Sequence, residues 1–390
     1  MAERRPLERV VRPCITDTVA VRLVKTLYGL TTSSIHKLDG YDDQNFHVKV
    51  QPCSTNPFIP EVWPHGYVLK ILNAIDSEEP EHVDGRTELL KHLNNKKIKV
   101  DGEIMQVPLP VQNIHGKYWS REKLHNQLEE NNKDTKGVPY DYYIVRMFRF
   151  VLGTTLDQVP LTPAILFQTG KLCGEINKAL EDFWHPSYEQ WDSIWKLDNL
   201  PKLSEYVQKF DDERKRRIIF EVIDTFNTEL LDSSMDITKG IVHGDINAQN
   251  ILTRENLSGD DAEVTYSLCG FIDVEHSHNG CYAFEVAIGM AYMMIESKVI
   301  DPLLAGGHFL AGYLQVRQLT SKEMDILWIC VAARLAQSLT FGWNGYLKDK
   351  SNAYFLITQE SGWRVMDKFW STNKNELYAK WKEVIASYNQ

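Results

Sequence analysis

The sequence has few cysteines, and none has the spacing of a metal or disulfide motif. Its 390 residues contain six cysteines, and no two of them form a CxxC pair. A disulfide framework requires clustered cysteines, and a structural zinc site requires paired ones. We therefore expect reduced thiols and a cytoplasmic protein.

Long apolar runs and excess positive charge are also missing. No stretch reaches the 18 or so apolar residues of a membrane helix, and the N-terminal residues 1–6 contain no apolar signal core. The formal net charge of −10 lacks the basic excess of a nucleic-acid binder. We therefore expect neither a membrane nor a nucleic-acid polymer as partner, and an acidic protein suits a small cationic substrate.

The remaining composition is that of a folded protein with two domains. The chain is 43% apolar, 25% charged and 11% aromatic, and its length exceeds that of one simple core. Strand patterns predominate over residues 1–150, and helical patterns predominate over residues 151–390. The sequence predicts an α+β fold with an antiparallel β-rich N-terminal lobe, a mainly helical C-terminal lobe and a cleft between them, where a ligand usually binds.

Periodicity predicts the main elements of both lobes. The first lobe should contain two helices, four strands and a solvated insertion: helices 16–29 and 82–94, strands 33–39, 45–51, 66–71 and 142–147, and insertion 117–137. The second should contain five long helices and three short strands: helices 161–184, 213–232, 284–297, 321–343 and 364–388, and strands 240–243, 250–254 and 264–273.

One constellation carries the spacing of phosphoryl-transfer chemistry. In the run from His243, Asp245 precedes Asn250 by five residues, and Asp273 ends an apolar strand 28 residues after Asp245. Kinases place a base Asp, a metal-binding Asn and a metal-binding Asp in this order. A lone His-Gly-Asp would more often be a polar turn. Because Lys70 also closes a strand upstream, as a phosphate-pairing lysine does, the set predicts a kinase site.

The departures from protein kinases favour a metabolite kinase. Gly244 stands where many protein kinases carry Arg, and no Ala-Pro-Glu motif follows. Glu275, two residues after Asp273, adds a carboxylate of the type that Mg²⁺ prefers. We therefore expect Asp245 to be the catalytic base and Asn250, Asp273 and Glu275 to be magnesium ligands.

The nucleotide contacts should come from the first lobe. The loop at 40–46 is not a GxGxxG cradle, and its Asp43, Gln44 and Asn45 fit a phosphate-binding loop and a plain hairpin turn equally well. Lys70 needs an acidic partner from the helix at 82–94. The candidates are Asp84, which we prefer, and Glu88. Finally, Met147 and Phe148 should line the nucleotide base.

These residues resemble the aminoglycoside phosphotransferase and choline kinase superfamily, which has a bilobal protein-kinase-like fold, and within it the hydroxylysine kinases. The resemblance spans residues 15 to 385 and is carried by the segments 41–48, 67–71, 243–247, 284–288, 292–298 and 306–308. It implies a transfer of phosphate from GTP to 5-hydroxy-L-lysine with magnesium. Asp84 departs from the Glu that the family has on this helix.

Two alternatives remain open. A choline- or ethanolamine-type kinase using ATP would also act on a cationic alcohol. A free basic side chain in the acceptor cleft would favour an amino acid, because choline has no carboxylate, whereas an aromatic cage would favour choline.

Glu285 or Glu275 could face the substrate ammonium, or serve only as a helix cap. A pseudokinase would need a lost catalytic residue, and none is lost.

Overall fold

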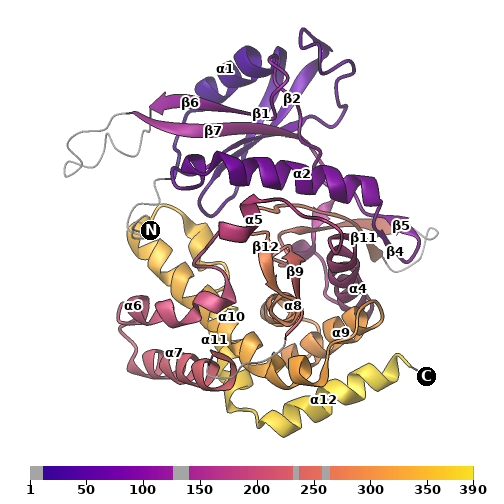
Figure 1. The fold of residues 1–390 in the computed structure, drawn as a ribbon, viewed down its shortest axis with the longest axis vertical. Helices are drawn as coiled ribbons and strands as arrows, with labels where there is room; N and C mark the ends of the chain where they lie inside the picture. The colour runs from indigo at the N-terminus through magenta and orange to yellow at the C-terminus, as the bar shows by residue number, and fades with distance from the viewer. Residues whose placement is uncertain (1–11, 126–139, 232–236, 257–263, 390) are drawn as a thin grey trace. The chain divides into compact units, whose positions relative to one another are not determined.

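The computed structural model describes residues 12–125, 140–231, 237–256 and 264–389, which form two compact units (Figure 1). The first unit comprises the chain up to residue 91 together with residues 108–152, and the second comprises residues 92–107 and the chain from 153 onward. The sequence predicted a single boundary at 150. The sequence did not predict that residues 92–107 belong to the second unit, because this segment begins inside a continuous helix.

A five-stranded antiparallel sheet forms the first unit. Its order is β1-β2-β3-β7-β6. The strands are β1 (Leu30–Leu38), β2 (Gln44–Ser54), β3 (Tyr67–Ile71), β6 (Trp119–His125) and β7 (Tyr140–Arg149). Trp119 to His125 were expected to belong to a solvated insertion, but they pair with β7 as an edge strand. Charged edge strands are common, because charge discourages further pairing. Residues 126–137 of that insertion lie outside the described residues.

Helix α1 (Asp17–Tyr28) packs its apolar face into the core of the first unit. Thr16 caps it by accepting a hydrogen bond from the Val19 amide at 3.2 Å, and Gly29 ends it at φ +63°. Leu23, Val24 and Leu27 are buried on this helix. A short 3₁₀ helix, η2 (Asp76–Glu78), precedes the second helix, α2 (Pro80–Lys96).

The second unit is mainly helical. Its α-helices are α4 (Pro163–Ala179), α5 (Ser187–Gln190), α6 (Ser204–Val207), α7 (Glu213–Phe226), α8 (Tyr282–Glu296), α9 (Pro302–Leu314), α10 (Ser321–Lys348), α11 (Gln359–Ser371) and α12 (Lys374–Ser387). Three short 3₁₀ helices are η3 (Leu156–Gln158), η4 (Leu197–Leu203) and η6 (Ala353–Leu356), and η5 (Asn227–Leu231) is a π-helix. The helix predicted over 364–388 is in fact two, because Asn373 caps a new helix.

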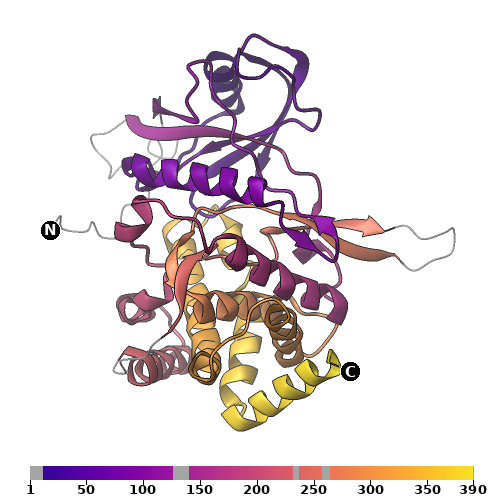
Figure 2. The same cartoon turned by 45° about the vertical axis from the view of Figure 1, so that its right-hand side comes forward.

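Short antiparallel strands in the second unit flank the loop 243–250. Strand β9 (Lys239–Val242) pairs with β12 (His278–Cys281), so the loop 243–250 leaves a sheet at a defined point. After it, β10 (Ile251–Asn256) pairs with β11 (Thr265–Phe271) as a long hairpin, salmon in Figure 2. The remaining short strands are β4 (Lys99–Val100), β5 (Glu103–Ile104) and β8 (Thr154–Thr155).

Helices α8 and α10 form the centre of the second unit. Every residue of α8 from Tyr282 to Ile295 is buried. Helix α10 is long and apolar enough by composition to cross a membrane, but 89% of its apolar window is buried inside the fold. Core packing therefore accounts for its apolar character. The side chains that anchor the loop 243–250 come from these two helices.

Candidate active site

The loop 243–250 is built on a glycine that no other residue can replace without strain. Gly244 has φ +81°, and a Cβ at this position would lie 2.2 Å from the carbonyl oxygen of His276. The backbone of the loop therefore passes directly against the turn that follows β11. Only glycine allows both the left-handed conformation and this close approach.

His243 joins the loop to the end of β11. Its Nε2 donates to the carbonyl of Ile272 at 3.1 Å, and its Nδ1 accepts from the Asp245 amide at 3.3 Å. Burial lowers the pKa of His243, although the nearby carboxylate of Asp245 acts in the opposite direction. A neutral imidazole with its proton on Nε2 satisfies both contacts.

Three donors fix the carboxylate of Asp245. Its Oδ2 accepts from Nδ2 of Asn247 at 2.8 Å and from Nδ2 of Asn250 at 3.1 Å, and its Oδ1 accepts from Nη2 of Arg334 at 2.7 Å. The side chain of Asp245 keeps 15% of its surface exposed. Because a carboxylate offers about four acceptor directions, one remains for a substrate hydroxyl. This is the geometry that a positioned base requires.

Asn250 is oriented by the same network. Its Nδ2 also donates to the Asp245 carbonyl at 3.0 Å, and its own carbonyl accepts from the Ile272 amide at 2.8 Å. The amide oxygen Oδ1 accepts no hydrogen bond from the described residues. A side-chain amide whose nitrogen is engaged presents its oxygen to a ligand, which suits a hard cation.

Asp273 follows β11 in a left-handed conformation, with φ +61°. Its Oδ1 accepts from the amide of Glu275 at 3.4 Å. A non-glycine residue in this region costs free energy, and such residues cluster at functional sites. The bond between Ile272 and Asn250 ties this turn to the loop 243–250, so the two predicted metal-binding residues lie on adjoining backbone segments.

The donor set fits magnesium better than a transition metal. In the described part of the chain, no group of three or more His, Cys, Asp or Glu side chains gathers as a metal cluster. Mg²⁺ is commonly held by one or two protein ligands, with waters and phosphates completing its octahedron. Asn250 and Asp273 meet that requirement. Glu275 is 7% exposed, and its metal role stays a prediction.

The sequence left open whether Glu285 faces a substrate ammonium. In the structure it does not. It lies fully buried on α8, where its two carboxylate oxygens accept from the amides of His243 and Gly244, each at 2.9 Å. Burial raises the pKa of Glu285 to about 7, although the two backbone donors lower it. Glu285 is thus an anchor that holds the loop to the core helix.

Arg334 on α10 was missed by the sequence analysis. Its side chain is 2% exposed and pairs with Asp245, while Nη1 donates to Oε1 of Gln337 at 3.1 Å and to the Trp195 carbonyl at 3.3 Å. One signal was present in the sequence: Arg334 is the single charged residue in the apolar stretch 326–347. An isolated charge in a core helix usually has a specific partner.

In the first unit, Lys70 pairs with a loop residue instead of the helix. Its Nζ lies 3.2 Å from Oδ2 of Asp43, and both side chains are largely buried. Asp43 also accepts from the amide and Nδ2 of Asn73, at 2.8 and 3.1 Å. Asn45 stands opposite Lys70 in the register of β2 and β3. The loop therefore places an acid beside the predicted phosphate-binding lysine.

The expected pairing of Lys70 with the α2 helix is corrected by the structure. Asp84 accepts from the indole Nε1 of Trp119 at 2.7 Å, and Glu88 pairs with Lys91 on the surface. The shorter side chain of Asp84 is satisfied by a neighbour on the edge strand β6. The sequence had no means of placing Trp119 there, because that segment was assigned to an insertion.

Two other predicted nucleotide contacts have structural roles instead. The side chain of Gln44 is 2% exposed and bonds both the amide and the carbonyl of Ile15, at 2.8 and 3.1 Å. Met147 is fully buried in the core of the first unit. Phe148 is 5% exposed, and the guanidinium of Arg146 lies over its ring. Gln44 and Met147 thus offer no surface to a ligand in this structure.

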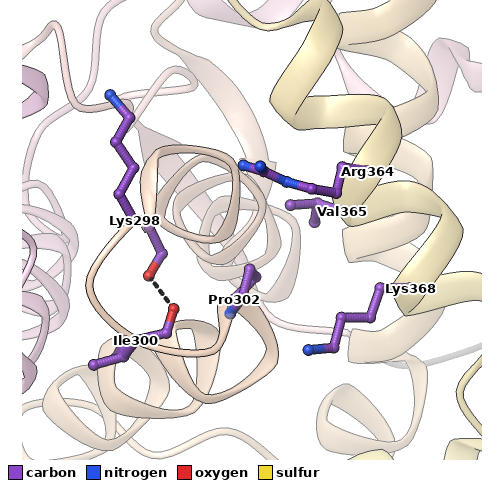
Figure 3. Close-up of a pocket in the computed structure, with 7 residues that line it drawn as sticks. Lys298, Ile300, Pro302, Arg364, Val365 and Lys368 are labelled. Atoms are coloured by element: carbon purple, nitrogen blue, oxygen red, sulfur yellow. Dashed lines mark hydrogen bonds between the residues drawn. The ribbon is translucent and has the colours of Figure 1, made fainter.

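A separate cavity lies at the end of α8. It has a volume of about 320 Å³ and is lined by Ser297, Lys298, Ile300, Pro302, Arg364, Val365 and Lys368 (Figure 3). Lys368 pairs with Asp301 at 2.8 Å. None of the predicted site residues lines this cavity, so we place the chemistry at the loop 243–250.

Comparison with known proteins shows the family of this chain. Residues 38–319 match the model of the phosphotransferase enzyme family, APH. The chain is 33% identical to hydroxylysine kinase of Xenopus laevis over 385 residues, which is 97% of this chain and 96% of that protein. It is 31% identical to hydroxylysine kinase of Bos taurus over 387 residues, or 98% and 96% of the two chains.

The fold has a counterpart among solved structures. A microcompartment-associated aminopropanol kinase superposes with a TM-score of 0.62 at 16% identity, covering 91% of this chain and 98% of that one. The predicted protein-kinase-like α+β fold, with an antiparallel first part and a helical second part, is confirmed. The chain belongs to the phosphotransferase enzyme family, and the hydroxylysine kinases are its relatives over nearly the full length.

Proposed function

We propose that this chain is a small-molecule kinase that transfers the γ-phosphate of GTP to the hydroxyl of 5-hydroxy-L-lysine. The observation that carries the proposal is the Asp245 carboxylate, held by three donors beside the oriented amide of Asn250. Relatives named hydroxylysine kinase, at 31% and 33% identity over nearly the whole chain, support the acceptor.

In the proposed reaction, Asp245 orients the acceptor hydroxyl and takes its proton. The hydroxyl oxygen bonds to the γ-phosphorus as the bond to the bridging oxygen of GDP breaks. Asn250 and Asp273, with Glu275 as a further candidate, would hold Mg²⁺, which neutralises phosphate charge when it is bound. Lys70, whose ammonium group Asp43 holds in place, would bind the phosphates. The six cysteines, all within the described residues, form no disulfide, which suits a reducing compartment such as the cytoplasm.

A panel of donors and acceptors tests the proposal. GTP or ATP with magnesium would be incubated with 5-hydroxy-L-lysine, choline, ethanolamine or homoserine, and release of GDP or ADP measured. We expect GTP with hydroxylysine to give the highest kcat/KM. Asp245→Asn, which keeps the shape but removes the proton acceptor, should lower kcat by about 10²–10⁴.

Two outcomes would contradict parts of the proposal. Preferred turnover of choline or ethanolamine with ATP would identify the alternative amino-alcohol kinase. Hydroxylysine-dependent GDP release no greater than that of Asp245→Asn would eliminate hydroxylysine as the acceptor.

A further inference from the structure

The guanidinium of Arg334 is held in an unusual environment for a buried charge. Its central carbon lies 5.1 Å from the ring centres of both Trp195 and Tyr292. The Tyr292 hydroxyl also interacts with it. Aromatic rings near a guanidinium stabilise its positive charge.

The donors of Arg334 are unevenly used along its two edges. Nη1 faces Gln337 and the Trp195 carbonyl. On the other edge, Nη2 donates to Oδ1 of Asp245, while the buried Nε has no partner among the described residues. A buried donor without a partner is unfavourable, and such a group calls for an explanation.

The Nε–Nη2 edge is the fork that binds a carboxylate with two parallel hydrogen bonds. In this structure a single oxygen of Asp245 occupies half of it. We propose that the Nε–Nη2 edge of Arg334 binds the carboxylate of the acceptor amino acid and, in doing so, leaves Oδ1 of Asp245 to the acceptor hydroxyl. This rests on the proposed function and deepens it, because it assigns the residue that selects an amino acid over a plain amino alcohol.

The arrangement links recognition to catalysis. A carboxylate on the fork satisfies Nε and replaces the bond that Nη2 makes to Asp245. The base then loses one donor and regains an acceptor direction at the moment the substrate arrives. An amino alcohol without a carboxylate leaves Arg334 on Asp245 and Nε without a partner.

The test compares hydroxylysine with 1,5-diaminopentan-2-ol, which has the same two amines and hydroxyl but no carboxylate. For the wild-type chain we expect the ratio of the two kcat/KM values to be roughly 100 or more, since two charged hydrogen bonds distinguish the substrates. In Arg334→Met the ratio should fall to about one. Arg334→Lys, which keeps the charge but loses the fork, should give an intermediate ratio.

A purely structural role for Arg334 predicts a different result. If it only positions Asp245, Arg334→Met slows both substrates equally and the ratio stays at its wild-type value, which would overturn the inference. Arg86→Met removes another buried arginine and should leave the ratio unchanged. A wild-type ratio near one would overturn the inference without any variant. Absence of hydroxylysine turnover by the wild type would instead remove the proposed function, and this inference with it.

Discussion

At the scale of single residues, the loop 243–250 depends on contacts with neighbours distant in sequence. Asp245 contacts Arg334, which is 89 positions away, and Glu285 accepts the amides of His243 and Gly244 from 42 and 41 positions away. The two bonds to Glu285 are buried and the bond to Asp245 is partly buried, where a hydrogen bond to a charged group contributes more than at the surface. The geometry of the loop is therefore a property of the core helices α8 and α10.

Replacement of Gly244 tests this geometry. Gly244→Ala should lower the free energy of unfolding by about 3 kcal/mol or more, because the new Cβ meets the His276 carbonyl and φ is positive. Denaturant unfolding measures the change. Gly102→Ala is the control: Gly102 has φ +89° but no atom within 4 Å of the added Cβ, so only about 1 kcal/mol should be lost. Equal losses would contradict the close approach.

Titration of Glu285 should appear in the pH dependence of stability. Its pKa is about 7 in the fold, against 4.5 ordinarily, so between these values the folded chain binds a proton that the unfolded chain has released. Stability from this group is present at low pH and decreases as pH rises, by up to about 1.4 kcal/mol per pH unit. The destabilisation caused by Glu285→Gln should therefore shrink from pH 4.5 to 7. A pH-independent difference between the two proteins would refute the raised pKa.

At the scale of elements, the N-terminal end of α10 is bonded to the residue that precedes β9, the strand that leads into the loop 243–250. Thr320 and Glu323 form a capping box, with bonds of 3.2 and 2.8 Å between each side chain and the other's amide. The second oxygen of Glu323 accepts from the Thr238 amide at 2.8 Å, directly before β9. One buried carboxylate thus fixes both a helix end and a strand start.

Removal of this carboxylate should cost more than removal of an ordinary cap. We expect Glu323→Ala to lower the free energy of unfolding by about 2–4 kcal/mol, since it leaves the Thr320 and Thr238 amides unsatisfied. Thr320→Ala removes one capping bond and should cost only about 1 kcal/mol. Chemical denaturation of the two variants provides the comparison, and the same loss in both would mean that the Thr238 contact contributes nothing.

At the scale of the whole molecule, ligands should stabilise the chain only in the right combination. GTP at 100 times its Kd should add about 2.7 kcal/mol and raise Tm by a few degrees, provided that magnesium is present. EDTA should abolish most of the shift, because Asn250 and Asp273 would hold the metal that carries the phosphates. Thermal denaturation with and without EDTA tests this.

The variant Asp273→Asn provides the control for that experiment. It keeps the size of the side chain but removes the charge that we assign to the metal. We expect its Tm shift with GTP to be small and insensitive to EDTA. A full magnesium-dependent shift in this variant would mean that Asp273 is not a ligand, and the assignment of the turn after β11 would need revision.

Much of the fold was predictable because its patterns are local. The helix at residues 16–29 has a capping Thr16 and an apolar face, and it occurs as α1. The change from strands to helices near residue 150 also follows from periodicity alone. The predictions fail where a segment takes its structure from a distant partner, as residues 119–125 do when they pair with β7.

The sequence by itself determined the order and spacing of Lys70, Asp245, Asn250 and Asp273, since the loop chemistry lies within short segments. Tertiary structure alone decided which side chains surround them. It gave Asp245 the partner Arg334, gave Lys70 the partner Asp43 and turned Glu285 into an anchor. The physical reason is that a buried charge takes whichever partner the packing of remote elements brings near, and local pattern does not encode that packing.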